Sequence, residues 1–152
     1  MKRQLMNKQI DFYILNDDVD RLSFACQLIE KAYRRQHRLF IQCSHEQQAH
    51  QLDDKLWLYK VNSFIPHNIQ GEGPNQPPPV QLGYSEQANG YNDILINLSL
   101  EVPSFHTQFK RVIEIVDTNE DTKQALREHY RYYQSQSYKI NSHKIAQTQL
   151  PK

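Results

Sequence analysis

Residues 10–43 read IDFYILNDDVDRLSFACQLIEKAYRRQHRLFIQC, and this stretch decides the fold class. Its first six residues form a run that is apolar apart from Asp11, which is typical of a strand buried on both faces. A turn rich in helix-capping residues follows, and apolar residues then recur at helical spacing. Those residues are Leu22, Ala25, Cys26, Ile29, Ala32 and Tyr33. Because residues 38–43 (RLFIQC) are expected to form a second short strand, the stretch predicts a strand–helix–strand unit.

The same alternation continues along the chain. Ser44, with Gln47 three residues later, predicts a capping box at the start of a second helix. Five of the seven prolines fall in residues 63–79, which excludes a helix or a central strand there. Further elements are expected as strands at residues 80–84, 93–98 and 111–116, a helical turn from Pro103, and a last helix capped by Asn119 or Thr118 and ending near residue 134.

We therefore predict an α/β fold with a single, mostly parallel sheet and helices on both faces. It would be Rossmann-like but without a nucleotide-binding motif. The domain is expected at residues 1–140. Residues 141–152 show little periodicity, so we expect a flexible C-terminal tail there.

The composition narrows the function classes. The 152 residues carry 18 Lys and Arg against 17 Asp and Glu, so the chain lacks the basic excess of duplex-binding domains. Two cysteines without CxxC spacing favour a reducing cytoplasm over a secreted scaffold. The apolar run at residues 10–15 is too short for a signal peptide, and no later run could span a bilayer, so no membrane association is expected.

Motifs for catalysis are weak. Gly71 and Gly73 form a Gly-x-Gly, but prolines follow where a dinucleotide fingerprint needs a helix. A carboxylate cluster (Asp17, Asp18 and Asp20) lies where the first strand ends, and it could hold Mg²⁺. We favour helix capping for these acids. Seven scattered histidines and two cysteines show no metal-ligand spacing, so we predict no catalytic residue, no metal and no cofactor.

The last helix carries a cationic stripe. Lys123, Arg127 and Arg131 stand four residues apart, with Tyr130 beside them. Leu126, Tyr130 and Tyr133 make the apolar edge of this face. One interpretation is a solvated basic face with a core-facing tyrosine. The other is a cationic groove with an aromatic floor, which would fit an acidic peptide with a terminal carboxylate.

Trp57 is a second candidate. The predicted second helix buries Ala49, Leu52 and Leu56, and Trp57 would point about 140° away from Leu52 at 100° per residue. Phe64 follows in the irregular segment. An exposed tryptophan near an apolar loop is typical of a protein-binding hot spot. Alternatively, the loop folds back over Trp57 as a satellite core.

Several segments of the chain resemble the chi subunit family of bacterial DNA polymerase III, over about residues 9–140. They are FYIL, LIEKAYRRQHRLFIQC, QAHQLDDKLW, SFIPHNIQGEGP, DILINL and KQALREHYRYY. The resemblance implies an α/β sheet of nucleotide-binding type that lacks the nucleotide site. It also implies a non-catalytic adaptor subunit of the clamp-loader complex, working in the cytoplasm during DNA replication and meeting DNA only indirectly.

The resemblance also implies partners and contact residues. The family binds the acidic, phenylalanine-ended C-terminal tail of single-stranded-DNA-binding protein, and it binds the psi subunit. An iron–sulfur helicase is expected to share the psi surface. The tail-binding positions fall on Val116, Lys123, Arg127, Tyr130 and Arg131, and the psi-binding positions fall on Trp57 and Phe64. At Arg131 the family commonly has lysine, which keeps the charge but changes the contact geometry.

Two other function classes stay open at this point. The first is a nucleotide- or phosphate-handling α/β enzyme that uses the Asp17–Asp20 cluster, although the missing glycine loop weighs against it. The second is a protein that binds nucleic acid directly, which would show a steep salt dependence and which the near-neutral charge disfavours.

Overall fold

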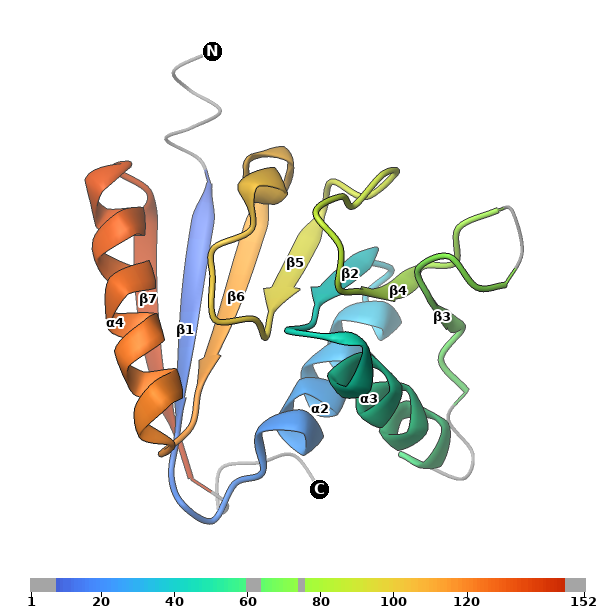
Figure 1. Cartoon of the computed structure of the whole chain (residues 1–152), viewed down its shortest axis with the longest axis horizontal. Helices are drawn as coiled ribbons and strands as arrows, with labels where there is room; N and C mark the ends of the chain where they lie inside the picture. The colour runs from blue at the N-terminus through green and yellow to red at the C-terminus, as the bar shows by residue number, and fades with distance from the viewer. Residues whose placement is uncertain (1–7, 60–63, 74–75, 147–152) are drawn as a thin grey trace.

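The computed structural model describes residues 8–59, 64–73 and 76–146, and Figure 1 shows their arrangement. Seven strands form one sheet in the order β3-β4-β2-β5-β6-β1-β7, and every neighbouring pair is parallel. The strands are β1 (Gln9–Leu15), β2 (Leu39–Gln42), β3 (His67–Ile69), β4 (Val80–Gly83), β5 (Ile94–Asn97), β6 (Arg111–Val116) and β7 (Lys139–Ile145). The predicted fold class, a parallel α/β sheet, is confirmed.

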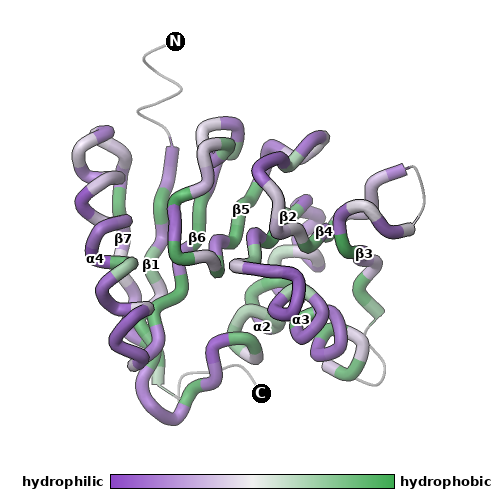
Figure 2. The backbone as a smooth tube through the Cα atoms, in the orientation of Figure 1, coloured by the Kyte–Doolittle hydropathy of each residue, from purple (hydrophilic) through white to green (hydrophobic). Residues whose placement is uncertain are grey.

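Helices cover the two faces of this sheet. α2 (Arg21–Arg34) and α3 (Glu46–Leu58) share one hydrophobic cluster, and α4 (Glu120–Ser135) belongs to another. Alternate residues of a strand point to opposite faces, so Ile113 of β6 joins the first cluster and Val112 the second. A short 3₁₀ helix, η1 (Ser104–Gln108), precedes β6. Figure 2 shows the hydrophobic residues along the inner strands and in parts of α2, whereas α3 and α4 are mostly hydrophilic.

Three adjacent inner strands, β4, β2 and β5, are buried along their whole length. All four residues of β2, β4 and β5 are buried, because layers cover both faces of the sheet. β1 is buried along most of its length, but Tyr13 is only half-buried and Ile14 is exposed near its carboxyl end. That exposed end lies beside α4, where a hollow opens in the surface.

The structure differs from the expected C-terminal tail. β7 spans Lys139–Ile145 and pairs with β1 along its whole length, from Gln9 opposite Lys139 to Leu15 opposite Ile145. The expected boundary at residue 140 therefore falls inside a strand. β7 lies at the edge of the sheet and none of its residues is fully buried, so its sequence lacks the apolar run that marks an inner strand. Residues 147–152 lie outside the described part of the chain.

Two local predictions are also refined. In the proline-rich segment, β3 is a three-residue edge strand, which agrees with the exclusion of a central strand there.

The cap of α3 is His45, one residue later than expected. Its Nδ1 accepts from the Gln48 amide at 3.1 Å, and Gln48 Oε1 accepts from the Ser44 amide at 2.7 Å. Gln48 therefore takes the part expected of Gln47, although its side chain bonds the amide before the cap residue and not that of the cap itself.

Candidate functional site

A hollow of ≈ 280 Å³ is lined by residues of α4, of the edge strand β7 and of its neighbour β1, with one residue of β6. We call it the α4 groove. Side chains from four elements line it: Phe12, Ile14, Val116, Lys123, Leu126, Arg127, Tyr130 and Ser142. Four of the five positions predicted for the tail-binding site therefore lie together in one hollow. Arg131, one helical turn further along α4, is exposed and is not part of the lining.

The floor of the α4 groove is apolar and aromatic. Phe12 and Leu126 are almost fully buried beneath it. The Tyr130 ring lies 5.4 Å from the Phe12 ring, centroid to centroid, at a tilt of 55°. Tyr130 is nevertheless 39% exposed, so part of its ring remains available to a ligand. An apolar or aromatic group entering the groove would be desolvated against these rings.

Cations line the helix side of the groove. Lys123 Nζ lies 3.9 Å from Glu120 Oε1, a loose surface pair on the first turns of α4. Arg127 stands one turn further along and is exposed. Because a guanidinium can bind both oxygens of a carboxylate, Arg127 suits an anionic group held above the apolar floor. The predicted stripe is thus divided: Lys123 and Arg127 face the groove, and Arg131 faces solvent beyond it.

A buried polar network fixes α4 on the sheet. Glu114 of β6 is fully buried, and its carboxylate accepts from Tyr133 Oη at 2.6 Å, His129 Nδ1 at 3.1 Å and Asn97 Nδ2 at 3.1 Å. His129 Nε2 donates to the Leu100 carbonyl at 3.1 Å. Both imidazole nitrogens face acceptors, so the ring is held as the cation. The network sets the position of α4 and therefore of Arg127 and Tyr130.

The acid–base properties of this network follow from its burial. Burial lowers the pKa of His129, but the hydrogen bond and the charge of Glu114 more than offset this, with help from the Leu100 carbonyl and Glu128, and the pKa is raised. Burial raises the pKa of Tyr133 well above its usual value, and the neighbouring Glu114 charge raises it further. Tyr133 was predicted on the apolar edge of the groove; it is instead a core residue that donates to Glu114.

Three groove residues were not identified from the sequence: Phe12, Ile14 and Ser142. Ser142 belongs to β7, whose polar pattern hid the strand. Ile14 is part of the apolar run of β1, and nothing in that run marks it as the residue left exposed. To identify Ser142 and Ile14 from the sequence, one would have to know that β1 pairs with β7. In that pairing Ile14 lies opposite Lys144.

The second predicted surface consists of Trp57 and Phe64; the exposed Leu58 follows Trp57 in the chain, and we call these three side chains the aromatic patch. The three side chains are 54%, 83% and 66% exposed. The Trp57 ring contacts Phe64 at 5.6 Å and His67 at 4.8 Å, centroid to centroid. The loop thus contacts Trp57, as a satellite core would require, but it leaves the ring exposed, as a protein-binding hot spot would require. Adjacent exposed apolar side chains of this kind mark interaction sites.

The acidic cluster at the end of β1 has a structural role for one member. Asp20 caps α2 by accepting from the Ser23 amide at 2.9 Å, and its pKa is lowered because this bond and Lys55 outweigh its burial. Asp17 and Asp18 line a hollow of ≈ 530 Å³ with Arg21 and Asp117. In the described part of the chain, no group of three or more His, Cys, Asp or Glu side chains could hold a metal ion.

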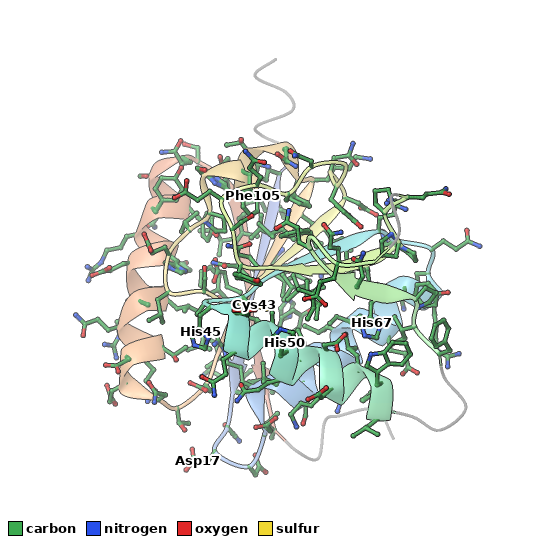
Figure 3. The ribbon with its side chains drawn as sticks, turned by 45° about the vertical axis from the view of Figure 1, so that its right-hand side comes forward. Asp17, Cys43, His45, His50, His67 and Phe105 are labelled. Carbon is green, nitrogen blue, oxygen red and sulfur yellow. The ribbon has the colours of Figure 1, made fainter. Side chains whose placement is uncertain are left out.

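The remaining candidate side chains have local structural roles. Burial raises the pKa of both Cys26 and Cys43 to about 12, so the thiols stay protonated and behave as core residues, as predicted. His45 caps α3, and His50 Nε2 lies 3.7 Å from Glu46 Oε2 on the same helix. Figure 3 shows these two histidines apart along α3. None of the helices in the described residues is long and apolar enough to cross a membrane.

The fold and the sites define a class: a one-sheet parallel α/β domain with a basic, aromatic groove at one sheet edge and an exposed aromatic patch at the other. A solved structure, the crystal structure of T4 UvsW, shares the fold with a TM-score of 0.63 at 9% identity, covering 91% of this chain and 41% of that one. At that identity the likeness concerns the fold alone.

Sequence comparison gives the family. Residues 6–141 match the family model of the DNA polymerase III chi subunit, HolC. The DNA polymerase III subunit chi of Pseudomonas aeruginosa is 37% identical over 139 residues, 90% of this chain and 96% of that protein. The subunit chi of Escherichia coli is 34% identical over 142 residues, 89% of this chain and 97% of that protein. This chain belongs to the chi subunit family of DNA polymerase III.

Proposed function

We propose that the chain is a non-catalytic adaptor of the DNA polymerase III holoenzyme, acting in the cytoplasm during DNA replication. It would link single-stranded-DNA-binding protein to the psi subunit of the clamp-loader complex and meet DNA only through these partners. Its membership of the chi family supports a place in DNA polymerase III. The presence of two separate exposed features, the α4 groove and the aromatic patch, supports the linking role.

The α4 groove suits an acidic peptide that ends in phenylalanine. Such a peptide presents an aromatic ring, a terminal carboxylate and several side-chain carboxylates. The ring would bury against Phe12 and Tyr130, gaining roughly 1.5–3 kcal/mol if fully desolvated. The terminal carboxylate would meet Arg127, where a charge-assisted hydrogen bond contributes about 1.5–3 kcal/mol. After the cost of association, these contributions favour a micromolar dissociation constant on the order of 10⁻⁶ M.

One observation carries this assignment: the apolar floor and the cations line the same hollow. The test is calorimetric titration of the whole chain with a synthetic acidic peptide ending in phenylalanine. We expect Arg127→Ala to weaken binding strongly, and removal of the terminal phenylalanine to do the same. Lys31→Ala is the matched control, because it removes an exposed cation from α2. Equal binding of the peptide without its phenylalanine would contradict the proposal.

The aromatic patch suits the psi subunit. Trp57 and Phe64 offer adjacent exposed rings that a partner could desolvate together. An iron–sulfur helicase would bind the same rings and therefore compete with psi. Trp57→Ala should abolish capture of purified psi and of the helicase alike, measured by co-purification. Capture of the helicase by a variant that no longer holds psi would separate the two surfaces.

The groove and the patch should be occupied at the same time. Ser142 of the groove is on β7 and His67 beneath Trp57 is on β3, and these are the two edge strands of the sheet. Six strand spacings of about 4.8 Å separate those edges by roughly 29 Å. A chain saturated with psi should bind the acidic peptide with unchanged affinity. A loss of peptide affinity on adding psi would contradict this arrangement.

A further inference from the structure

β7 is an edge strand, and its outer side has no neighbour among the described strands. Figure 1 shows it at one end of the sheet, next to β1. In a parallel ladder, alternate residues of a strand direct both the N–H and the C=O toward the same neighbour. The Lys139 amide donates to the Lys8 carbonyl at 3.3 Å, and the Ile145 carbonyl accepts from the Asn16 amide at 3.0 Å. The odd-numbered residues of β7 therefore face β1.

The even-numbered residues of β7 direct their backbone groups away from the sheet. Ile140, Ser142 and Lys144 each present an N–H and a C=O to the open edge, and no described residue supplies a partner for these groups. Such an edge is a template on which an extended peptide can pair as an added strand. From Ile140 to Lys144 the edge measures about 13 Å, which is room for about five residues of a peptide.

This open edge is continuous with the α4 groove. The side chains of the same three residues point to the α4 face of the sheet, because Ile140 packs against the cluster that includes Leu126, and Ser142 lines the groove. Lys144 is exposed on that face, opposite Ile14, which also lines the groove. A peptide whose end is seated in the groove therefore reaches the edge of β7 by passing Ser142.

The charges of β7 select an acidic partner for the edge. The strand reads KINSHKI, with two lysines, one histidine and no carboxylate. A second copy of β7 would bring like charges together across the new strand pair, which is destabilising. Acidic side chains would instead lie near Lys144 on the strand side of the groove, while Lys123 and Arg127 line its helix side.

We propose that the residues preceding the C-terminal phenylalanine of an acidic peptide pair with the open edge of β7 as an added strand, with Lys144 facing their carboxylates. This inference rests on the proposed binding of such a peptide in the α4 groove, and it adds a site that recognises the peptide backbone. Lys144 lies beyond residue 141, where the match to the family model ends, so its role does not follow from that match.

The experiment titrates the full chain calorimetrically, at low salt, with two synthetic peptides. One has four residues, three aspartates and a terminal phenylalanine; the other adds five residues, alternately threonine and aspartate, before them. We expect the longer peptide to bind about tenfold more tightly through its backbone hydrogen bonds. Lys144→Gln should weaken the longer peptide about threefold and leave the shorter one unchanged. Lys139→Gln is the matched control, because this exposed side chain of the same strand points to the opposite face.

Backbone N-methylation of the longer peptide separates an added strand from simple charge attraction, because it removes a hydrogen-bond donor and keeps the charge. Methylation of one alternate set of the five added residues should abolish the tenfold gain, and methylation of the other set should preserve it. In the isotope-labelled full chain, the longer peptide alone should slow hydrogen exchange of the Ile140 and Lys144 amides.

The outcomes separate this inference from the groove assignment on which it rests. Equal affinities of the two peptides, or equal losses from both methylated sets, would overturn the added strand and leave the groove assignment in place. Failure of both peptides to bind would overturn both. Dimerisation of the peptide-free chain with protection of the same amides would assign the edge to a second copy and overturn the inference.

Discussion

The α4 groove and the aromatic patch lie at opposite edges of one sheet and are built in different ways. Side chains of β1, β6, α4 and β7 assemble the groove, and the buried carboxylate of Glu114 holds its helix in place. The patch consists of exposed rings at the end of α3 and just beyond it. The groove therefore depends on the integrity of the fold, whereas the patch depends on side chains that the fold does not need.

The largest expected effect comes from Glu114, the buried carboxylate that holds α4 beside the groove. Glu114→Gln removes the charge that faces His129, and breaking a buried ionic pair costs about 3 kcal/mol of the free energy of unfolding. For a chain of this size that lowers the melting temperature by roughly 6–12 °C. Peptide affinity at the groove should fall, while capture of psi at the patch should persist at 20 °C. Calorimetric melting and the two binding assays measure this.

The control for that change is Asp54→Asn, which removes an exposed carboxylate from α3, away from the Glu114 network. It should alter the melting temperature by less than about 2 °C, since surface substitutions usually stay within ~0.5 kcal/mol. Equal destabilisation by the two substitutions would mean that Glu114 does not hold α4.

The second effect removes the patch without touching the fold. Trp57→Ala truncates a side chain that is more than half exposed, so the melting temperature should hardly change. Truncation of an aromatic anchor typically costs at least ~2 kcal/mol of binding, or roughly 30-fold in the dissociation constant of psi. Peptide affinity at the α4 groove should be unchanged. A sharp drop in melting temperature would instead make Trp57 part of the core.

A smaller effect sharpens the description of the groove itself. Arg127 lines the hollow and Arg131 does not, although both lie on the same predicted stripe. Arg127→Gln should weaken the acidic peptide by about 1.5 kcal/mol, the low end for a hydrogen bond to a charged group. Arg131→Gln should cost no more than about 0.5 kcal/mol, because an exposed charge acts mainly by steering and is screened by salt. Equal losses would extend the site by one helical turn.

These predictions rest on features that the sequence could and could not supply. The stripe of Lys123 and Arg127 could be predicted because helical spacing is local and needs no knowledge of the partner strands. Exposure of Trp57 followed from the same periodicity. The chi-like segments also pointed to the family, and the comparisons confirm that prediction.

The remaining parts depend on contacts between distant residues. Ser142 reaches the groove only because β7 pairs with β1, and an edge strand with mixed burial has no apolar run to reveal it. Glu114 looked like one polar residue in an apolar strand, RVIEIV. Its role depends on His129 and Tyr133, which α4 brings to it from 15 and 19 residues away. Long-range register of this kind cannot be obtained from composition or spacing.

The smallest effect tests the network by titration. The pKa of His129 is raised in the folded chain above its ordinary value of 6.5, because the hydrogen bond and charge of Glu114, the Leu100 carbonyl and Glu128 outweigh the burial that lowers it. Folding therefore binds a proton more tightly, and the resulting stability is fully present below pH 6.5. It is lost as pH rises through the folded pKa of His129, and above that value no further loss comes from this group.

His129→Gln isolates this contribution, because other groups titrate nearby. Burial lowers the pKa of His106. The contribution of His106 to the free energy of unfolding is therefore lost as pH falls, whereas that of His129 is lost as pH rises. Both proteins retain His106, and the difference between their urea unfolding free energies should therefore report His129 alone. We expect the advantage of the wild type to be largest below pH 6.5 and to shrink steadily above it. A difference that stays constant from pH 5.5 to pH 9 would mean that His129 is not held as a cation by Glu114.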